Sequence, residues 1–211
     1  MKTPYLIKVC GITNPADAVA AVDAGATAIG INFFTGSKRY VAPERAREIA
    51  DAVRGRAAVV GVFVNEPLES AKAIAAAVKL TYCQFHGDET PEYVGRFQNA
   101  FKAFRIDDAH RSIDFDDYHC PAFLLDAYSE QEYGGTGRTF DWLLAREANE
   151  FGRIIVAGGL TPDNVAEAVD TAQPWGVDVS SGVESAPGVK DHNAMARFIT
   201  AARAAFIRQT T

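Results

Sequence analysis

The chain has 211 residues, 48% of them hydrophobic and 23% charged, a composition typical of a globular protein with one substantial core. Its formal charge of -6 at pH 7 argues against a general surface for nucleic acid or membranes, so we expect neither as a partner. Three widely spaced cysteines predict neither a disulfide framework nor a zinc site, and reduced thiols fit the cytoplasm. No run approaches the roughly 18 apolar residues of a membrane span, and we expect no targeting or anchoring segment.

Short apolar runs rich in β-forming residues recur along the chain and predict eight strands. The runs are Tyr5–Cys10, Thr27–Phe33, Ala57–Val64, Leu80–Phe85, Phe101–Ile106, Ala122–Asp126, Arg153–Ala157 and Gly176–Ser180. The segment Ala58–Val64 is apolar throughout, which is typical of a parallel strand that is covered on its outer face by helices.

Ala-rich amphipathic stretches follow most of these strands and predict helices. They are Asn14–Ala24, Pro43–Val53, Leu68–Val78, Pro91–Asn99, Phe140–Glu150, Pro162–Thr171 and Asp191–Ile207. Proline lies near the start of several of them, where its missing N–H costs nothing, and Asn14 and Thr161 are candidate caps. The polar segment 107–119 predicts that the fifth helix is short or irregular.

Strand and helix therefore alternate in eight units, and no linker or second domain boundary interrupts them. This order favours a single-domain (βα)8 TIM barrel over residues 1–211, an α/β fold with eight parallel strands. An open doubly wound sheet is the alternative.

In a barrel of this kind the active site lies at the carboxyl ends of the strands. Residues that carry chemistry occur there. Cys10 follows the first strand, Arg39 lies in the loop after the second, His86 follows the fourth, Asp126 ends the sixth, and Asp178 lies in the eighth.

Cys10 and Asp126 together suggest one shared acid–base site. A lone cysteine at a strand end is usually a small buried side chain, and Cys83 and Cys120 are interpreted in that way. Strand alternation places Lys8 on the face of Cys10, and an inward lysine needs a partner, for which Asp178 is a candidate.

Glycine-rich loops follow the last two predicted strands, at Ala157–Asn164 and Ser180–Glu184. They present backbone N–H groups where such barrels bind phosphate, which indicates a small phosphorylated substrate. A single Gly-Gly pair is more often a tight turn, but two such loops on adjacent strands favour phosphate binding. The candidate phosphate ligands are Gly158, Gly159, Ser181 and Gly182.

Seven blocks, in order along the whole chain, closely resemble the phosphoribosylanthranilate isomerase family of tryptophan biosynthesis. They lie at Lys8–Thr13, Ser37–Val41, Val60–Pro67, Gln84–Glu89, Leu124–Ala127 with Gly134–Trp142, Ala157–Val165 and Gly176–Asp191. This resemblance implies an aldose–ketose isomerase that converts N-(5'-phosphoribosyl)anthranilate into 1-(2-carboxyphenylamino)-1-deoxyribulose 5-phosphate. The family performs this Amadori rearrangement without a metal or an organic cofactor.

The same resemblance implies roles for individual residues. Asp126 would be the general acid that protonates the ring oxygen, and Cys10 the general base that removes the proton on C2. Arg39 would bind the anthranilate carboxylate, although Lys38 and the residues before it depart from the common family pattern. Asp178 would contact the sugar or the enolamine, or else pair structurally with Lys8. His86 would lie beside the substrate, or else be a hydrogen-bonded turn residue.

Two other functions remain open. The chain could be another phosphosugar-converting barrel enzyme, although the neighbouring indole-glycerol-phosphate synthase chemistry would call for catalytic lysine and glutamate at strand ends. It could also be a catalytically silent phosphate-binding or assembly barrel.

We interpret Ala127–Thr139 as a mobile cover over the site, and we leave the oligomeric state open between monomer and homodimer.

Overall fold

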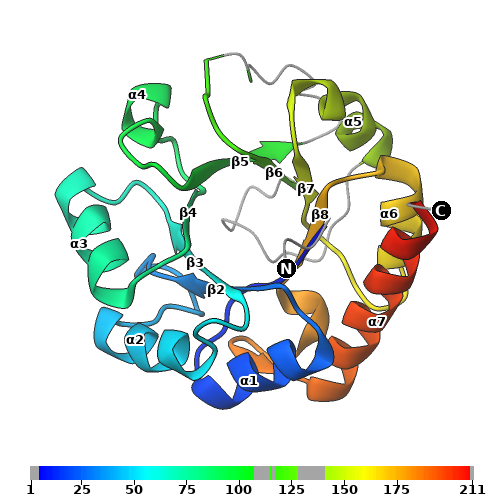
Figure 1. The fold of residues 1–211 in the computed structure, drawn as a ribbon, viewed down its shortest axis with the longest axis horizontal. Coiled ribbons are helices and arrows are strands. Elements are labelled where there is room, and N and C mark those ends of the chain that lie inside the picture. Colours follow the sequence, from blue (N-terminus) through cyan, green and yellow to red (C-terminus); the bar gives the residue numbers. More distant parts are fainter. Residues whose placement is uncertain (1–4, 107–114, 116, 128–140, 210–211) are drawn as a thin grey trace.

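Eight parallel strands form a closed barrel in the computed structural model, which describes residues 5–106, 115, 117–127 and 141–209. Each strand pairs with the next, and β8 pairs with β1 (Figure 1). The strands are β1 (Leu6–Val9), β2 (Ala28–Asn32), β3 (Ala58–Phe63), β4 (Tyr82–Phe85), β5 (Ala100–Ile106), β6 (Phe123–Ala127), β7 (Ile154–Val156) and β8 (Gly176–Val179). All eight predicted strands are confirmed, and the pairing of β1 with β8 excludes the open sheet.

Helices surround the barrel and cover the outer face of its strands (Figure 1). They are α1 (Pro15–Ala24), α2 (Pro43–Ala52), α3 (Leu68–Val78), α4 (Pro91–Val94), α5 (Trp142–Glu147), α6 (Val165–Ala172) and α7 (His192–Gln209). The predicted cap Asn14 is confirmed, because its side chain accepts a hydrogen bond of 2.9 Å from the N–H of Asp17. Among the described helices, none is long and apolar enough to cross a membrane.

Three predicted helix bounds need correction. The helix α4 ends at Val94 rather than near Asn99, because the N–H of Gly95 closes the last turn onto Pro91 and the chain then leaves the helix. After α5 the chain tightens into the 3-10 turn η1 (Ala148–Phe151).

The start of α6 differs for a local reason. The side chain of Asn164 accepts from the N–H of Thr161 at 2.7 Å and donates to the carbonyl of Gly159 at 2.9 Å. These bonds hold a turn ahead of the helix, so Asn164 occupies the cap position and the prediction of Thr161 as the cap is wrong.

Two predictions fall largely outside the described residues. These are the short or irregular helix within 107–119, of which 107–114 and 116 are not described, and the mobile cover at Ala127–Thr139, of which only Ala127 is described. Both stay predictions.

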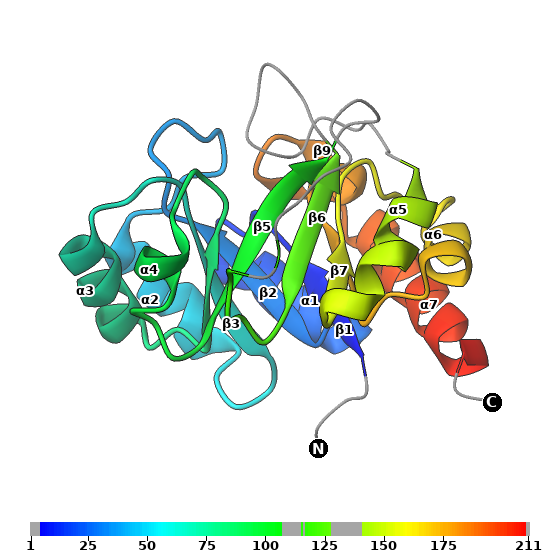
Figure 2. The same ribbon diagram turned by 90° about the horizontal axis from the view of Figure 1, so that it is seen from above.

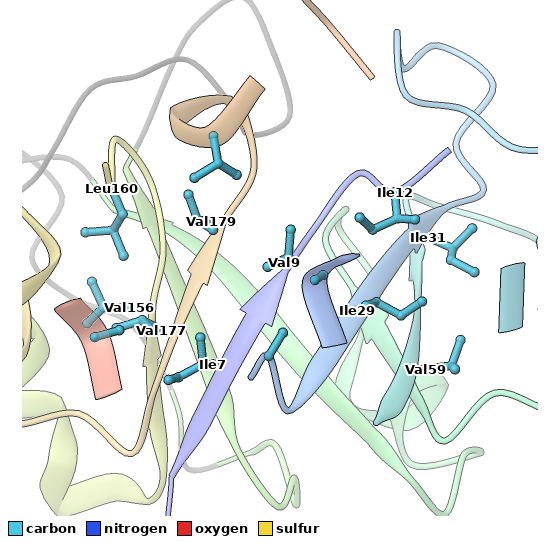
Figure 3. Packing of buried hydrophobic residues seen from close by; sticks show 14 of the residues in the cluster. Ile7, Val9, Ile12, Ile29, Ile31, Val59, Val156, Leu160, Val177 and Val179 are labelled. Carbon is cyan, nitrogen blue, oxygen red and sulfur yellow. The ribbon is translucent and has the colours of Figure 1, made fainter. Parts of the chain in front are cut away.

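Alternation along the strands divides the side chains between two cores. Ile7, Val9 and Ile29 belong to the large cluster between strands and helices, part of which Figure 3 shows. The barrel interior holds a second, smaller apolar cluster, whose members lie mostly in the first halves of their strands. It comprises Ala28, Val60, Phe101, Ala103, Ala122, Leu124, Ile155 and Ala157. The interior beyond this cluster, toward the carboxyl ends, is where polar side chains gather.

A short two-stranded sheet follows β8 at this end of the barrel. The chain forms the 3-10 turn η2 (Ser181–Val183) and then pairs β9 (Glu184–Ala186) with β10 (Val189–Lys190). Figure 2 shows β9 at the end toward which the strands of the barrel point. The sheet therefore lies beside the place where parallel barrels carry their active sites.

Replacing Phe63 tests the packing between barrel and helices. This buried ring stacks on Phe33 with centroids 5.2 Å apart and lies 5.9 Å from Phe85. We expect Phe63→Ala to lower the free energy of unfolding in urea by about 3–5 kcal/mol because it leaves a cavity. Leu143→Ala, at a side chain that is 51% exposed, should cost less than about 0.5 kcal/mol. A loss below about 1 kcal/mol for Phe63→Ala would contradict this packing argument.

Candidate active site

One cavity opens among the carboxyl ends of the strands, and it brings most of the predicted site residues together. Its lining includes Cys10, Arg39, His86, Asp126, Asp178 and Gly158. These residues lie at or just beyond the ends of β1, β4, β6, β7 and β8, and in the loop after β2. Gly159, Ser181 and Gly182 are not among the residues that line this cavity; they lie in the loops after β7 and β8.

A buried ion pair crosses the seam where the barrel closes. Lys8 of β1 is opposite Asp178 of β8 in the strand register, and its Nζ lies 2.9 Å from Asp178 Oδ2. Burial by itself lowers the pKa of Lys8, but the charges of Asp178 and of a Cys10 thiolate outweigh it and raise the pKa. Lys8 is therefore charged, and the expected pairing of Lys8 with Asp178 is confirmed.

Cys10 lies two residues beyond Lys8 on the same strand face, half-buried in the cavity wall. Burial raises the pKa of its thiol, and this effect exceeds the opposing effect of the Lys8 charge. The thiol is thus predominantly protonated at neutral pH, with a cation beside it that favours the small thiolate fraction.

Asp126 is the last residue of β6 whose side chain faces the barrel interior, and it is only 4% exposed. His86 Nε2 lies 3.3 Å from its Oδ2, and the Gln84 side-chain amide lies 3.0 Å from His86 Nδ1. An amide N–H donated to Nδ1 leaves the proton of a neutral imidazole on Nε2, which faces Asp126. The histidine therefore lies beside the carboxyl group, and its Nε2 has no hydrogen-bond partner among the described residues.

Arg39 reaches the cavity from the loop after β2, but one edge of its guanidinium is already engaged. Its Nε donates to Glu184 Oε1 at 2.9 Å, and its Nη2 donates to Glu184 Oε2 at 2.7 Å. A substrate carboxylate would therefore have to meet Arg39 on an edge other than the Nε–Nη2 edge.

The two glycine loops lie against each other beyond the paired strands β7 and β8. A Cβ built at Gly182 would lie 1.9 Å from the carbonyl oxygen of Leu160, so the backbones are in direct contact. Gly158 has a φ of 82°, and a Cβ there would lie 2.6 Å from Asp126 Oδ1. A glycine at this position therefore leaves room for the carboxyl group of β6.

Sequence patterns could have identified some of the other site residues but not all of them. Asn32, Ser37, Gln84 and Ser180 also line the cavity. Gln84 lies two residues before His86, so strand alternation would have predicted that both face inward. Glu184 had no comparable signal, because its contact with Arg39 joins loops that are far apart in the chain.

Comparisons with known proteins agree with this geometry. The family model described as N-(5'phosphoribosyl)anthranilate (PRA) isomerase matches residues 7–201. The N-(5'-phosphoribosyl)anthranilate isomerase of Trichlorobacter lovleyi is 48% identical over 201 residues, which cover 94% of this chain and 98% of that protein.

Solved structures of the same family superpose on the chain. The phosphoribosyl anthranilate isomerase of Thermotoga maritima has a TM-score of 0.86 at 38% identity, covering 95% of this chain and 99% of that one. A structure in complex with reduced 1-(o-carboxyphenylamino)-1-deoxyribulose 5-phosphate has a TM-score of 0.83 at 36% identity, with the same coverage. Another, of monomers generated from the dimeric Thermotoga maritima protein, has a TM-score of 0.81 at 36% identity and likewise covers 95% and 99%.

The family match spans nearly the whole chain, the relatives are covered almost end to end, and the barrel superposes on theirs. The chain belongs to the N-(5'-phosphoribosyl)anthranilate isomerase family, the isomerases of tryptophan biosynthesis.

Proposed function

We propose that this chain rearranges N-(5'-phosphoribosyl)anthranilate to 1-(2-carboxyphenylamino)-1-deoxyribulose 5-phosphate with Asp126 as the general acid and Cys10 as the general base. One observation carries the assignment of the pair: both side chains line the same cavity, from strands that are not neighbours in the barrel. Groups on separate walls can act on different atoms of one bound molecule.

The acid step opens the furanose ring. Asp126 delivers a proton to the ring oxygen, the bond from that oxygen to C1 breaks, and the nitrogen lone pair forms the C1 iminium. The burial of Asp126, which is only 4% exposed, limits the access of bulk water to its carboxyl group.

The base step removes the proton on C2. The iminium next to this carbon acidifies the C–H bond, so Cys10 can take the proton although its thiolate is scarce. The C–H electrons form the C1–C2 double bond and neutralise the iminium nitrogen. The enolamine then gains a proton on C1 and loses one from its C2 hydroxyl, which gives the ketone without net change in composition.

The remaining cavity residues bind the substrate in this proposal. Arg39 binds the anthranilate carboxylate, and Asp178 and His86 contact the sugar portion beside Cys10 and Asp126. Asp178 keeps one carboxylate oxygen, Oδ1, that has no hydrogen-bond partner among the described residues and is suited to accept from a sugar hydroxyl.

The phosphate site is proposed at the glycine loops, with Gly158, Gly159, Ser181 and Gly182 as its backbone and side-chain donors. Support comes from the pairing of β7 with β8 and from the direct contact of the two loops. The three free cysteines support a reducing compartment such as the cytoplasm.

A catalytically silent barrel is the second candidate. It would bind the phosphorylated ligand through the same loops but would not need both a thiol and a carboxyl group in the cavity wall. Purified, folded wild type that bound the ligand but failed to consume freshly made substrate would establish this alternative, and the fluorescence of the anthranilate group reports the turnover.

Replacing either member of the proposed pair should nearly abolish turnover. We expect Cys10→Ser and Asp126→Asn each to lower kcat by at least about a hundredfold, the usual scale for a lost proton-transfer group. Cys120→Ser, at another half-buried thiol, and Asp23→Asn, at an exposed carboxylate of α1, should leave kcat unchanged in the same assay. Near-full kcat in Cys10→Ser would place the base elsewhere.

The raised pKa of Cys10 predicts how its reactivity depends on pH. Only the thiolate is alkylated, and raising the pKa lowers the thiolate fraction at any given pH below it. The rate of carboxamidomethylation of Cys10 by iodoacetamide, followed by peptide mass spectrometry, should reach half its maximum above about pH 8.5, the value for a free thiol. A midpoint at or below that of free cysteine measured in parallel would refute this prediction.

Removal of the guanidinium should weaken binding more than chemistry. We expect Arg39→Ala mainly to raise KM, because the carboxylate contact is present in both ground and transition states. Steady-state kinetics separate the two parameters. A fall in kcat at unchanged KM would instead mean that Arg39 acts only in the transition state.

A further inference from the structure

Glu184, the first residue of β9, binds two basic side chains at once beside the cavity. Its carboxylate accepts from Arg39 Nε and Nη2 and also from Lys190 Nζ, at 2.7 Å from Oε1. Lys190 Nζ donates in addition to the carbonyl of Ser180, 3.1 Å away, at the end of β8. All three charged side chains are largely buried, with exposed fractions of 11% for Arg39, 4% for Glu184 and 0% for Lys190.

Two basic side chains therefore share one carboxylate in this cluster. Burial by itself raises the pKa of Glu184, but the hydrogen bonds and charges of Arg39 and Lys190 outweigh it and lower the pKa, so the carboxylate is ionised at neutral pH. Burial lowers the pKa of Lys190 and outweighs the opposing effect of the Glu184 charge.

The stem of Arg39 is confined as closely as its head. It passes over Gly11, the residue after Cys10, where φ is 73° and a Cβ would lie 2.5 Å from Arg39 Cδ. The arginine is thus held at its stem by close packing and at its guanidinium by hydrogen bonds from Nε and Nη2 to Glu184.

We propose that Glu184 is a positioning residue for the reaction: it orients the guanidinium of Arg39 before the substrate arrives, so that another edge of the guanidinium meets the anthranilate carboxylate. This inference rests on the proposed role of Arg39 and extends it to a residue that is not among those lining the cavity. Lys190 completes the arrangement by sharing the charge of Glu184.

Two opposing effects decide whether such a clamp helps binding. Glu184 repels the incoming carboxylate, but Lys190, 2.7 Å from its Oε1, offsets that repulsion. Holding Arg39 in one orientation removes the rotamer freedom that this long side chain would otherwise lose on binding. With the repulsion offset, the gain from preorganisation determines the outcome, and the clamp strengthens binding of the carboxylate specifically.

Two ligands distinguish a positioning role of Glu184 from a general contribution of Glu184 to the stability of the fold. The first is reduced 1-(o-carboxyphenylamino)-1-deoxyribulose 5-phosphate, and the second is the same compound without its carboxyl group. Calorimetry gives the Kd of both for wild type, Glu184→Gln, Arg39→Ala and the double variant, with Glu69→Gln at an exposed helix carboxylate as the control.

We expect Glu184→Gln to raise the Kd of the carboxylated ligand about tenfold and to change the Kd of the other ligand by less than about twofold. In the Arg39→Ala background the same change should alter either Kd by less than about twofold, because the group through which Glu184 acts is gone.

Equal weakening of both ligands by Glu184→Gln, while Arg39→Ala affects only the carboxylated one, would overturn the positioning role and leave the proposed function intact. Equal weakening by Arg39→Ala would overturn the carboxylate role of Arg39 and this inference with it. Should Glu184→Gln fail to fold, Glu184→Asp keeps the charge but shortens the reach, and the same selective loss is expected.

Discussion

The site depends on one buried ion pair at the seam of the barrel. Lys8 and Asp178 are opposite each other where β1 meets β8, and this pairing of strands is the one that closes the cylinder. An unpaired lysine inside the barrel would carry a large desolvation penalty, so the closed register and the salt bridge require each other. Strand alternation then faces Cys10, two residues after Lys8, into the cavity.

The barrel interior changes from apolar to polar along the barrel axis. Apolar side chains fill the first halves of the strands, and polar ones line the cavity at the carboxyl ends. Each reactive group has a neighbour of distinct type: Lys8 lies beside Cys10, His86 beside Asp126, and Glu184 beside Arg39. Lys8 partly opposes the effect of burial on the Cys10 thiol, and Glu184 orients the Arg39 guanidinium.

The fold is predictable from the sequence because its signals are local. An apolar run followed by an amphipathic helix recurs along the chain, and parallel strands bring all their carboxyl ends to one side. For that reason the sequence pattern alone predicts that Cys10, Asp126 and Asp178 lie together, and the cavity contains them all.

The features that could not be predicted depend on contacts between loops that are distant in the chain, or on a turn that one polar side chain holds. The clamp of Glu184 on Arg39 joins the loop after β2 to the loop after β8. The late start of α6 follows from two hydrogen bonds of Asn164 that compete with the helix. Patterns of hydrophobicity carry no information on either, because both concern polar atoms whose partners are set by loop geometry.

The central claim is that Asp126 protonates the ring oxygen and Cys10 removes the proton on C2 of the same bound substrate. A crystal structure of the chain with reduced 1-(o-carboxyphenylamino)-1-deoxyribulose 5-phosphate tests this claim most directly. The account predicts the Cys10 sulfur against C2 of the ligand, the Asp126 carboxyl within hydrogen-bond reach of the oxygen that closed the ring, and the phosphate at the glycine loops. A ligand bound in the cavity with C2 turned away from the sulfur would contradict it.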